Sequence, residues 1–121
     1  MQIVRIQTNI RNGDISEKFE QDISYSLSSA MDLPAEKFVI IVEAAARMSL
    51  GFGSKETPVA VVSLQTTRPS SQSENDLYAK KLTLVLREHL KLDPAHIFIT
   101  FDFKDAKSFA VQGKTIASLY E

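Results

Sequence analysis

The chain has 121 residues, no cysteine and two histidines, and its 14 basic and 15 acidic residues give a formal net charge of −1. The absence of cysteine excludes disulfides, thiolate nucleophiles and zinc–thiolate centres, and the balanced charge argues against nucleic acid as the main partner. No metal site on His89 and His96 and no cofactor is expected. The chain shows neither a signal peptide nor the ~20 apolar residues of a membrane span, so we expect a cytoplasmic protein without membrane insertion.

The first half of the chain contains two predicted strands. Residues 3–10 alternate in polarity, with Val4, Ile6 and Thr8 on one face, which is typical of a half-buried strand. Residues 38–42 are a continuous β-branched and aromatic run. Such a run predicts a strand that is buried on both faces.

A helix is predicted between these strands. Asp14 followed three residues later by Glu17 fits a capping box. From Ile15 onwards an apolar residue recurs every four positions as far as Met31, which gives one apolar helical face. Pro34 follows shortly after and indicates that the helix has ended.

The second half predicts the same order of elements. A loop leads into a strand, a connection rich in proline and serine leads into an amphipathic helix, and a further strand precedes a tail with one short apolar stretch around Gly113. The ranges are 47–58 for the loop, 59–64 for the strand, 67–73 for the connection, 73–90 for the helix, 97–103 for the last strand and 109–121 for the tail.

Two short matches indicate an internal repeat. Residues 4–8 match 62–66 at an offset of 58, and the Pro-Ala-x-x-Phe segment 34–38 matches 94–98 at an offset of 60. Both matches fall at the same stage of the two halves. We therefore interpret the chain as a single domain, 1–121, with pseudo-repeats at about 1–58 and 59–121.

This order predicts an α/β (α+β) fold. A β-α-β unit has parallel strands and a right-handed crossover. Two such units give a four-stranded mixed sheet with two helices on one face. The opposite face is then uncovered, which predicts a homo-oligomer.

Several short segments, in their order and spacing, carry a family resemblance. They are Thr8-Asn9-Ile10, the Pro34 step into Phe38-Val39-Ile40, Met48-Ser49-Leu50-Gly51, Gly53-Ser54, Pro58-Val59-Ala60, Ser63-Leu64, Ile97-Phe98-Ile99, Phe101-Asp102 and Gly113-Lys114-Thr115-Ile116-Ala117. Through them nearly the whole chain resembles the macrophage migration inhibitory factor (MIF) family of the tautomerase superfamily. The resemblance implies a MIF-like tautomerase fold and a homotrimer in which three sheets enclose a central channel.

Members of this family usually tautomerise small aromatic keto acids, and the resemblance implies where the reacting groups would lie. The base is a proline at the mature N-terminus, whose pKa is lowered by an apolar pocket. Here that position holds Gln2, whose amide is not a base. The lysine that binds the substrate carboxylate is replaced by Leu33, and the tyrosine and asparagine of the late strand by Phe98 and Thr100. The resemblance thus implies a chain without the family's keto–enol tautomerase activity.

Other departures surround the same pocket. The family's Ser-Ile-Gly segment reads Thr66-Thr67-Arg68, and its CxxC pair is replaced by Val59 and Val62. We assign no catalytic residue and no metal ligand. The candidate pocket positions are Gln2, Leu33, Ser63, Leu64, Thr66, Phe98, Thr100 and Phe109.

The leading hypothesis is a cytokine-type or ligand-binding protein. The resemblance implies a homotrimer, a cell-surface receptor, a small aromatic ligand and secretion by a non-classical route. One alternative is a weak phenylpyruvate-type tautomerase that uses the Met1 amine or another base. The reference pKa of such an amine is about 7.7–8.0, but the amine lies roughly 3.5 Å further out than that of the family's proline. Another alternative is a degenerate paralogue that assembles with active family members.

Several of these residues also have a simpler, purely structural interpretation. Gln2 can be an ordinary strand residue, and Leu33 and Phe98 can be core or subunit-interface residues. The Gly-Phe-Gly-Ser loop at 51–54 precedes no helix, so it lacks the requirements of a phosphate site. The serines near residue 71 are best explained as N-caps of the second helix.

Overall fold

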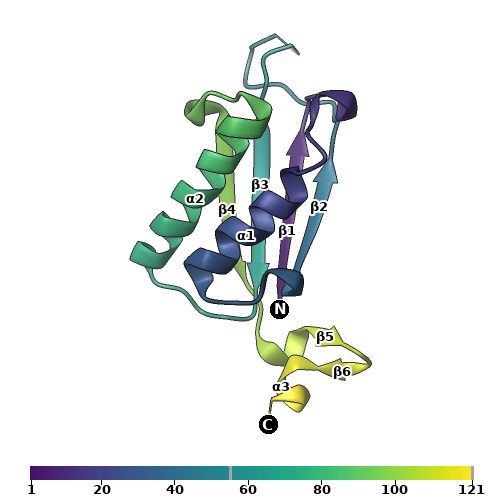
Figure 1. Cartoon of the computed structure of the whole chain (residues 1–121), viewed down its shortest axis with the longest axis vertical. Coiled ribbons are helices and arrows are strands. Elements are labelled where there is room, and N and C mark those ends of the chain that lie inside the picture. The colour runs from purple at the N-terminus through teal and green to yellow at the C-terminus, as the bar shows by residue number, and fades with distance from the viewer. Residues whose placement is uncertain (55, 121) are drawn as a thin grey trace.

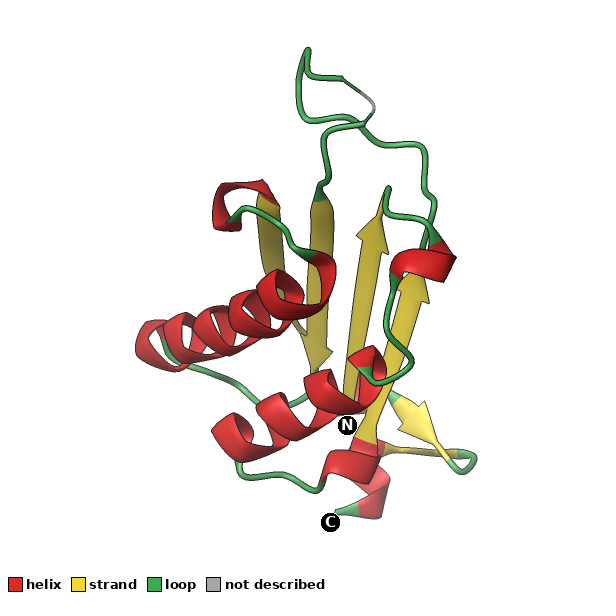
Figure 2. Cartoon of the chain, turned by 45° about the horizontal axis from the view of Figure 1, so that its top comes forward, coloured by secondary structure: helices red, strands yellow, loops and turns green. Residues whose placement is uncertain are grey.

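Two long helices lie side by side across one face of a four-stranded sheet in the computed structural model, which describes residues 1–54 and 56–120 (Figure 1). Figure 2 shows the same two layers from another angle. The main elements are β1 (Gln2–Thr8), α1 (Phe19–Met31), β2 (Phe38–Glu43), β3 (Ala60–Thr66), α2 (Gln72–Leu90) and β4 (Ile97–Phe103). A C-terminal segment adds β5 (Ala110–Val111), β6 (Lys114–Thr115) and α3 (Ile116–Leu119).

The sheet has the strand order β2-β1-β3-β4. β1 pairs with β2 in parallel and β3 pairs with β4 in parallel, whereas β1 and β3 are antiparallel. Two β-α-β units thus meet at the centre of one mixed sheet, with α1 and α2 on the same face. The predicted fold class is confirmed.

The predicted capping box at Asp14 and Glu17 is wrong. α1 begins at Phe19, and Asp14 lies in a separate 3-10 turn, Asn12–Asp14. The Asp14 carboxylate instead accepts a bond of 3.3 Å from the Arg11 side chain. A second turn follows before α1, in which the backbone N–H groups of Lys18 and Phe19 donate to the hydroxyl and the carbonyl of Ser16, each at 3.1 Å. Such local side-chain bonds to the backbone compete with the helix, which therefore begins later than the capping box predicted.

α2 has the cap that its sequence favours. The hydroxyl of Ser71 accepts a bond from the backbone N–H of Glu74, and the Glu74 carboxylate accepts one from the backbone N–H of Ser71. This reciprocal pair satisfies two of the free donors at the helix start. The two helices are also joined directly, since Nε2 of His89 lies 2.7 Å from Oδ2 of Asp22.

The core lies between the sheet and the helices. The apolar residues that recur every four positions along α1 point into this core, and so does every second residue of the central strands β1 and β3. These spacings follow from the periodicities of helix and strand. Its fully buried members include Val4, Ile6, Phe19, Ile23, Leu27, Val62, Leu82 and Leu86.

The other face of the sheet is uncovered in the single chain. Val39 is 46% exposed, Val61 37% and Phe98 46%, and all three point away from the helices. The prediction that residues 38–42 are buried on both faces is therefore wrong for the isolated chain, because the chain supplies one helical layer only. We call this surface the open face.

The open face has a nearly two-fold pattern. Apolar residues lie side by side at diagonally opposite corners, Ile3 beside Val39 and Val61 beside Phe98. At the other two corners a glutamine lies beside an acid, Gln7 with Glu43 and Gln65 with Asp102. The Gln7 amide donates to the Glu43 carboxylate at 3.0 Å.

The strand register corrects one sequence match. Phe38 pairs with Gln2 at the start of β2, and Ile97 pairs with Ala60 at the start of β4. Ile97 therefore holds the place that the sequence match gave to Phe98. As a result Phe38 is buried in the core, whereas Phe98 lies on the open face.

The C-terminal segment lies beyond the end of β4, near the N-terminus (Figure 1). β5 and β6 form a hairpin whose central residues Gln112 and Gly113 have φ values of 57° and 75°. Two positive φ angles are the signature of a type I′ turn, and they explain the glycine at 113.

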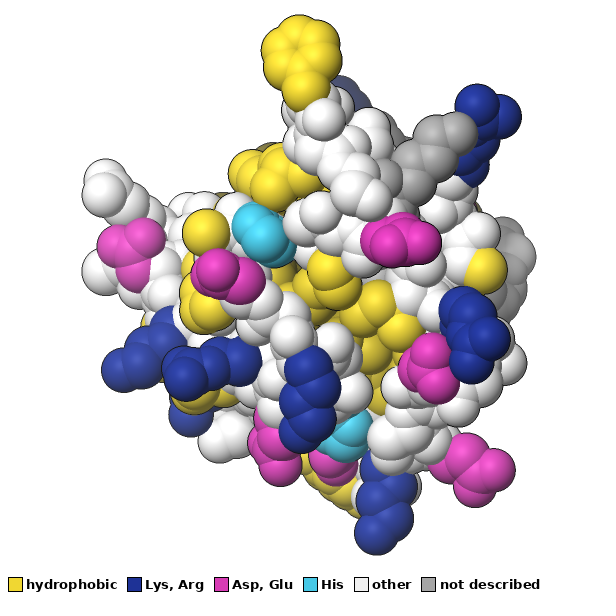
Figure 3. Space-filling view, turned by 90° about the horizontal axis from the view of Figure 1, so that it is seen from above, with side chains coloured by type: hydrophobic (Ala, Val, Ile, Leu, Met, Phe, Trp, Pro, Cys, Tyr) yellow, Lys and Arg dark blue, Asp and Glu magenta, His cyan; other side chains and the backbone are white. Residues whose placement is uncertain are grey.

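The surface at the end of the molecule opposite the C-terminal segment carries both positive and negative side chains. Figure 3 shows hydrophobic side chains in a central hollow there, with basic and acidic side chains interspersed around it. Among residues 1–54 and 56–120, no helix is both long and apolar enough to cross a membrane.

Candidate functional site

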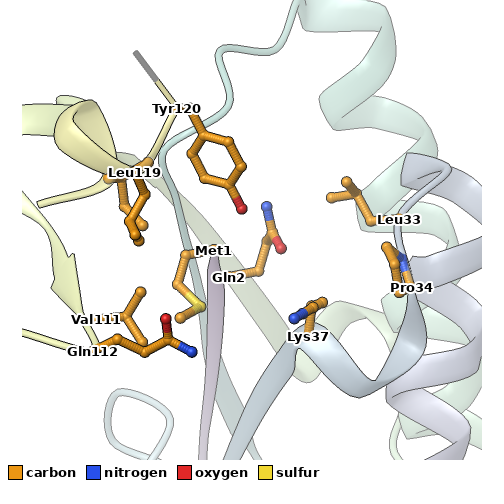
Figure 4. A pocket seen from close by; sticks show the side chains of 10 residues that line it. Met1, Gln2, Leu33, Pro34, Lys37, Val111, Gln112, Leu119 and Tyr120 are labelled. Carbon is orange, nitrogen blue, oxygen red and sulfur yellow. The ribbon is translucent and has the colours of Figure 1, made fainter. Parts of the chain in front are cut away.

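A cavity of about 390 Å³ lies where the start of β1 meets the C-terminal segment (Figure 4). Three parts of the chain build its wall: the N-terminus, the connection from α1 to β2, and the segment from β5 onwards. The lining residues are Met1, Gln2, Leu33, Pro34, Lys37, Val111, Gln112, Ile116, Leu119 and Tyr120.

Gln2 is fixed in the wall of this cavity. It is the first residue of β1 and is only 2% exposed, because its side chain lies on the helix-facing side of the sheet. Its Nε2 donates to Oγ1 of Thr66, its partner on β3, at 3.3 Å. The same Thr66 oxygen accepts the backbone N–H of Arg68 at 3.0 Å. Gln2 is therefore held by a buried polar contact across the sheet.

Leu33 is placed by the end of α1. Asp32 adopts the left-handed conformation with φ 54°, and this reverses the chain direction after the helix. The N–H of Leu33 then donates to the carbonyl of Ser28 at 3.2 Å, and the Ser28 hydroxyl donates back to the Leu33 carbonyl. This pair of bonds presents Leu33 and the following Pro34 to the cavity.

Among the described residues that line the cavity, the charged groups are cationic. Met1 carries the α-amine and Lys37 a side-chain ammonium, and none of the ten lining residues is Asp or Glu. Burial lowers the pKa of the Met1 α-amine below its ordinary value of 8.0. More of this amine is thus neutral near pH 7 than in an exposed chain end, because desolvation disfavours the charged form.

The remaining wall combines apolar surface with polar side chains. Leu33, Pro34, Val111 and Leu119 supply apolar contacts. Figure 4 shows the hydroxyl of Tyr120 directed towards the amide of Gln2, across the mouth of the cavity. A cavity of this size and lining suits a small ligand with an apolar body and an anionic group.

Comparison with protein families gives a match over almost the entire chain. The family model described as macrophage migration inhibitory factor (MIF) matches residues 1–117. The chain belongs to the MIF family. Among its curated relatives, a MIF homolog of Brugia malayi is 31% identical over 110 residues, covering 91% of this chain and 94% of the relative. The MIF-like protein mif-2 of Caenorhabditis elegans is 27% identical over 117 residues, covering 97% of this chain and 96% of the relative.

Solved MIF structures share the fold. The MIF of Oncomelania hupensis superposes with a TM-score of 0.88 at 19% identity, covering 95% of this chain and 82% of that one. The MIF of Trichinella spiralis gives a TM-score of 0.86 at 22% identity, covering 93% of this chain and 98% of that one. The predicted family and fold are thereby confirmed, independently of any activity.

The eight pocket positions that the MIF resemblance implied fall in different places. Gln2 and Leu33 line the cavity, and Thr66 contacts Gln2. Leu64 is buried in the core, 1% exposed. Phe109 is half-buried in the C-terminal segment.

The other three positions lie on the open face. Ser63 on β3 is the register partner of Thr100 on β4, and Phe98 lies beside Val61. A single chain therefore brings Gln2, Leu33 and Thr66 together and keeps Ser63, Phe98 and Thr100 apart from them. Any site that combines both groups needs a second copy of this surface.

The sequence analysis missed several lining residues. Lys37 ends the short 3-10 turn Ala35–Lys37 that follows the extended Pro34, and no pattern in the sequence marks it. Val111, Leu119 and Tyr120 come from elements of two to four residues or from the chain end. Elements this short show no periodicity, so the sequence pattern alone could not reveal them.

Proposed function

We propose that this MIF-family chain is a homotrimeric ligand-binding or cytokine-type protein that lacks the proline-dependent keto–enol tautomerase activity of the family. The observation that carries the proposal is the state of Gln2. The position that the family resemblance gives to the catalytic proline holds a buried side-chain amide bonded to Thr66. An amide accepts no proton near neutral pH, so it cannot serve as the general base that tautomerisation needs.

The cavity supports a small aromatic ligand with a carboxylate or similar anion. Its apolar wall fits a ring, and the ammonium of Lys37 favours negative charge. Lys37 lies on the opposite side of Pro34 from Leu33, the position at which the family has its lysine. In this proposal Lys37 binds the negative charge of the ligand, in place of the lysine that the family has at the position of Leu33.

The open face supports the homotrimer. Its exposed apolar corners, Val39 and Phe98 among them, are the kind of surface that proteins cover by self-association. Since Ser63 and Thr100 share this face, association would also complete the set of pocket positions. A cell-surface receptor and export by a non-classical route are part of this proposal and rest on family membership.

The direct test is tautomerisation of an aromatic α-keto acid by the purified protein, with the N-terminal residue identified by mass spectrometry. We expect no turnover by the natural chain. The Gln2→Pro variant loses Met1 during synthesis, exposes a secondary amine at the family position and gains activity. Gln2→Ala is the matched control, since it also loses Met1 but exposes a primary amine. Turnover by the natural chain at the rate of Gln2→Pro would refute the proposal.

A weak phenylpyruvate-type tautomerase is the second candidate function. The lowered pKa of the Met1 α-amine favours it, because this amine is then a usable base near neutral pH. Against it stands the position of that amine, roughly 3.5 Å beyond the site of a residue-2 amine. Selective acetylation of the α-amine abolishes such activity while ligand binding at the apolar wall persists. Activity that survives acetylation excludes Met1 as the base.

A further inference from the structure

The sequence contains one Asn-Gly step, Asn12–Gly13, and it lies in the exposed 3-10 turn that precedes α1. In such a step the backbone nitrogen of the second residue can reach the side-chain carbonyl carbon of the asparagine and close a five-membered ring. A glycine in the second place favours this closure, because it has no Cβ to hinder the approach and its backbone is the least restricted. The space at Gly13 is open, since nothing lies within 4 Å of the position that a Cβ would take.

The reacting groups of this step are not tied up by other contacts. Asn12 and Gly13 are both exposed. Within residues 1–54 and 56–120, neither the side chain of Asn12 nor the N–H of Gly13 has a hydrogen-bond partner. The first N–H groups of a helical turn have no partner within the turn, and the carbonyl of Ile10, three residues before Gly13, accepts the N–H of Ala45 at 2.8 Å. The nitrogen and the carbon that it attacks are therefore both accessible to solvent and to each other.

We propose that Asn12 is a site of spontaneous deamidation, at which the side-chain amide is converted to a carboxylate as aspartate or isoaspartate. This inference is independent of the function proposed above. It makes the turn before α1 a modification site, and the fraction of converted chains then rises with the age of the protein.

The reaction balances with water as its only co-reactant. The nitrogen of Gly13 gives its proton to the solvent and attacks Cγ of Asn12, so that a C–N bond forms and closes a succinimide ring. The bond from Cγ to the side-chain nitrogen breaks, and that nitrogen leaves as ammonia. Water then adds to a ring carbonyl and opens the ring. Opening at one carbonyl gives aspartate and opening at the other gives isoaspartate, with no change in oxidation state.

The other two asparagines of the chain are held in place by their surroundings. Asn9 is fixed on both sides of its amide, since Nδ2 donates to the carbonyl of Thr57 at 2.8 Å and Oδ1 accepts the N–H of Val59 at 3.0 Å. Asn75 lies in α2, and its Oδ1 is bonded to the Ser70 hydroxyl. The backbone N–H that follows it is directed along the helix to the carbonyl four residues earlier. The structure thus distinguishes Asn12 from two internal controls.

The product differs from the natural turn in charge and in connectivity. A carboxylate at residue 12 competes with Asp14 for Arg11, whose Nε lies 3.3 Å from the Asp14 carboxylate. In the isoaspartyl form the main chain runs through Cγ, so the carbonyl of Asn12 that accepts the N–H of Ile15 at 3.1 Å leaves the main chain. Ile15 packs against the hydrophobic core. The modification therefore loosens the residue that joins this turn to the core.

The test incubates the purified full chain at neutral pH and body temperature and follows Asn9, Asn12 and Asn75 by peptide mapping with mass spectrometry. Water enriched in heavy oxygen labels each new carboxylate, and an isoaspartyl methyltransferase measures the isoaspartate. A synthetic peptide of residues 9–16 gives the rate without the fold. Gly13→Ala is the matched variant, and it folds because the added Cβ meets no atom.

We expect conversion at Asn12 alone among the three asparagines, at a rate within about tenfold of that of the peptide. Gly13→Ala should slow the conversion by about tenfold, which corresponds to a rise of about 1.4 kcal/mol in the barrier. In the isoaspartyl form, separated by ion exchange, the amide of Ile15 should exchange its hydrogen faster than in the natural chain, because its acceptor is lost.

Three results overturn the inference. They are conversion at Asn9 or Asn75 as fast as at Asn12, a folded chain that reacts more than about tenfold slower than the peptide, and equal rates for Gly13→Ala and the natural chain. An unchanged exchange rate of the Ile15 amide in the isoaspartyl form overturns the stated effect on the turn.

Discussion

Replacing Thr66 by valine tests the contact that holds Gln2 in the cavity wall. Valine has nearly the same shape as threonine but lacks the hydroxyl oxygen that accepts bonds from Gln2 and from the backbone of Arg68. Both residues of the pair are buried, Gln2 to 2% exposure and Thr66 to 4%. The variant therefore leaves the Gln2 amide without this partner in a place that water reaches poorly.

The expected cost follows from the geometry. An unsatisfied buried donor costs about 1–3 kcal/mol. The Gln2–Thr66 distance of 3.3 Å is longer than an average bond, and Arg68 is exposed enough for water to replace its lost partner, so we expect about 1.5 kcal/mol for Thr66→Val. The double variant Gln2→Met with Thr66→Val removes donor and acceptor together and should recover most of this loss, because no polar group then remains unpaired.

Urea unfolding followed by far-UV circular dichroism measures the effect. With a slope of about 1–3 kcal/mol per molar urea, the midpoint of Thr66→Val should fall by about 0.5–1.5 M. All samples need the same protomer concentration, because self-association makes apparent stability depend on concentration. An unchanged midpoint, or a double variant as unstable as the sum of the two single ones, would contradict the buried pair described here.

Three further predictions concern the helix caps, the open face and pH. Ser71→Ala should lower the free energy of unfolding by about 1 kcal/mol, because it removes the cap of α2. Asp14→Ala should change the free energy of unfolding by less than about 0.5 kcal/mol, since Asp14 caps no helix. Equal effects of the two substitutions in thermal unfolding would contradict this assignment. Phe98→Glu should dissociate the oligomer in analytical ultracentrifugation, while Leu84→Glu on α2, a residue of similar exposure, should leave its mass unchanged; an intact Phe98→Glu oligomer would rule out the open face as the interface. Hydrogen bonds from Ser71 lower the pKa of Glu74 below 4.5. Its stabilising contribution is therefore complete above the unfolded-state pKa and is lost as the pH falls through the lower folded-state pKa, and Ser71→Ala should reduce this acid sensitivity in melting experiments.

Long periodic elements were predictable from the sequence. The alternation of Val4, Ile6 and Thr8 gave the correct buried face of β1, and β4 has the predicted bounds 97–103. The start of α1 was not predictable in this way. Asp14 lies in the separate turn Asn12–Asp14, and a sequence pattern does not show which of several short-range turns the chain adopts before the helix.

The candidate site was predictable in part. Gln2 and Leu33 could be found because they sit at the ends of regular elements that the family resemblance also marks. The opposite wall, with Val111 and Tyr120, comes from more than 100 residues further along the chain and from a hairpin too short to show a pattern. Its approach to Met1 is a property of the folded chain.

Residues from both ends of the described chain line the cavity, since Met1 and Tyr120 both form part of its wall (Figure 4). The composition of the site is therefore sensitive to any change at these two residues. The contents of the cavity would change if an aminopeptidase removed Met1, if an acetyltransferase modified its nitrogen, or if an affinity tag were fused to either end. The amino-acid sequence of the rest of the domain would stay the same in each case. Proteins from different expression hosts can thus share one sequence and differ at this site, and the mass of the terminal peptides belongs with every activity measured on them.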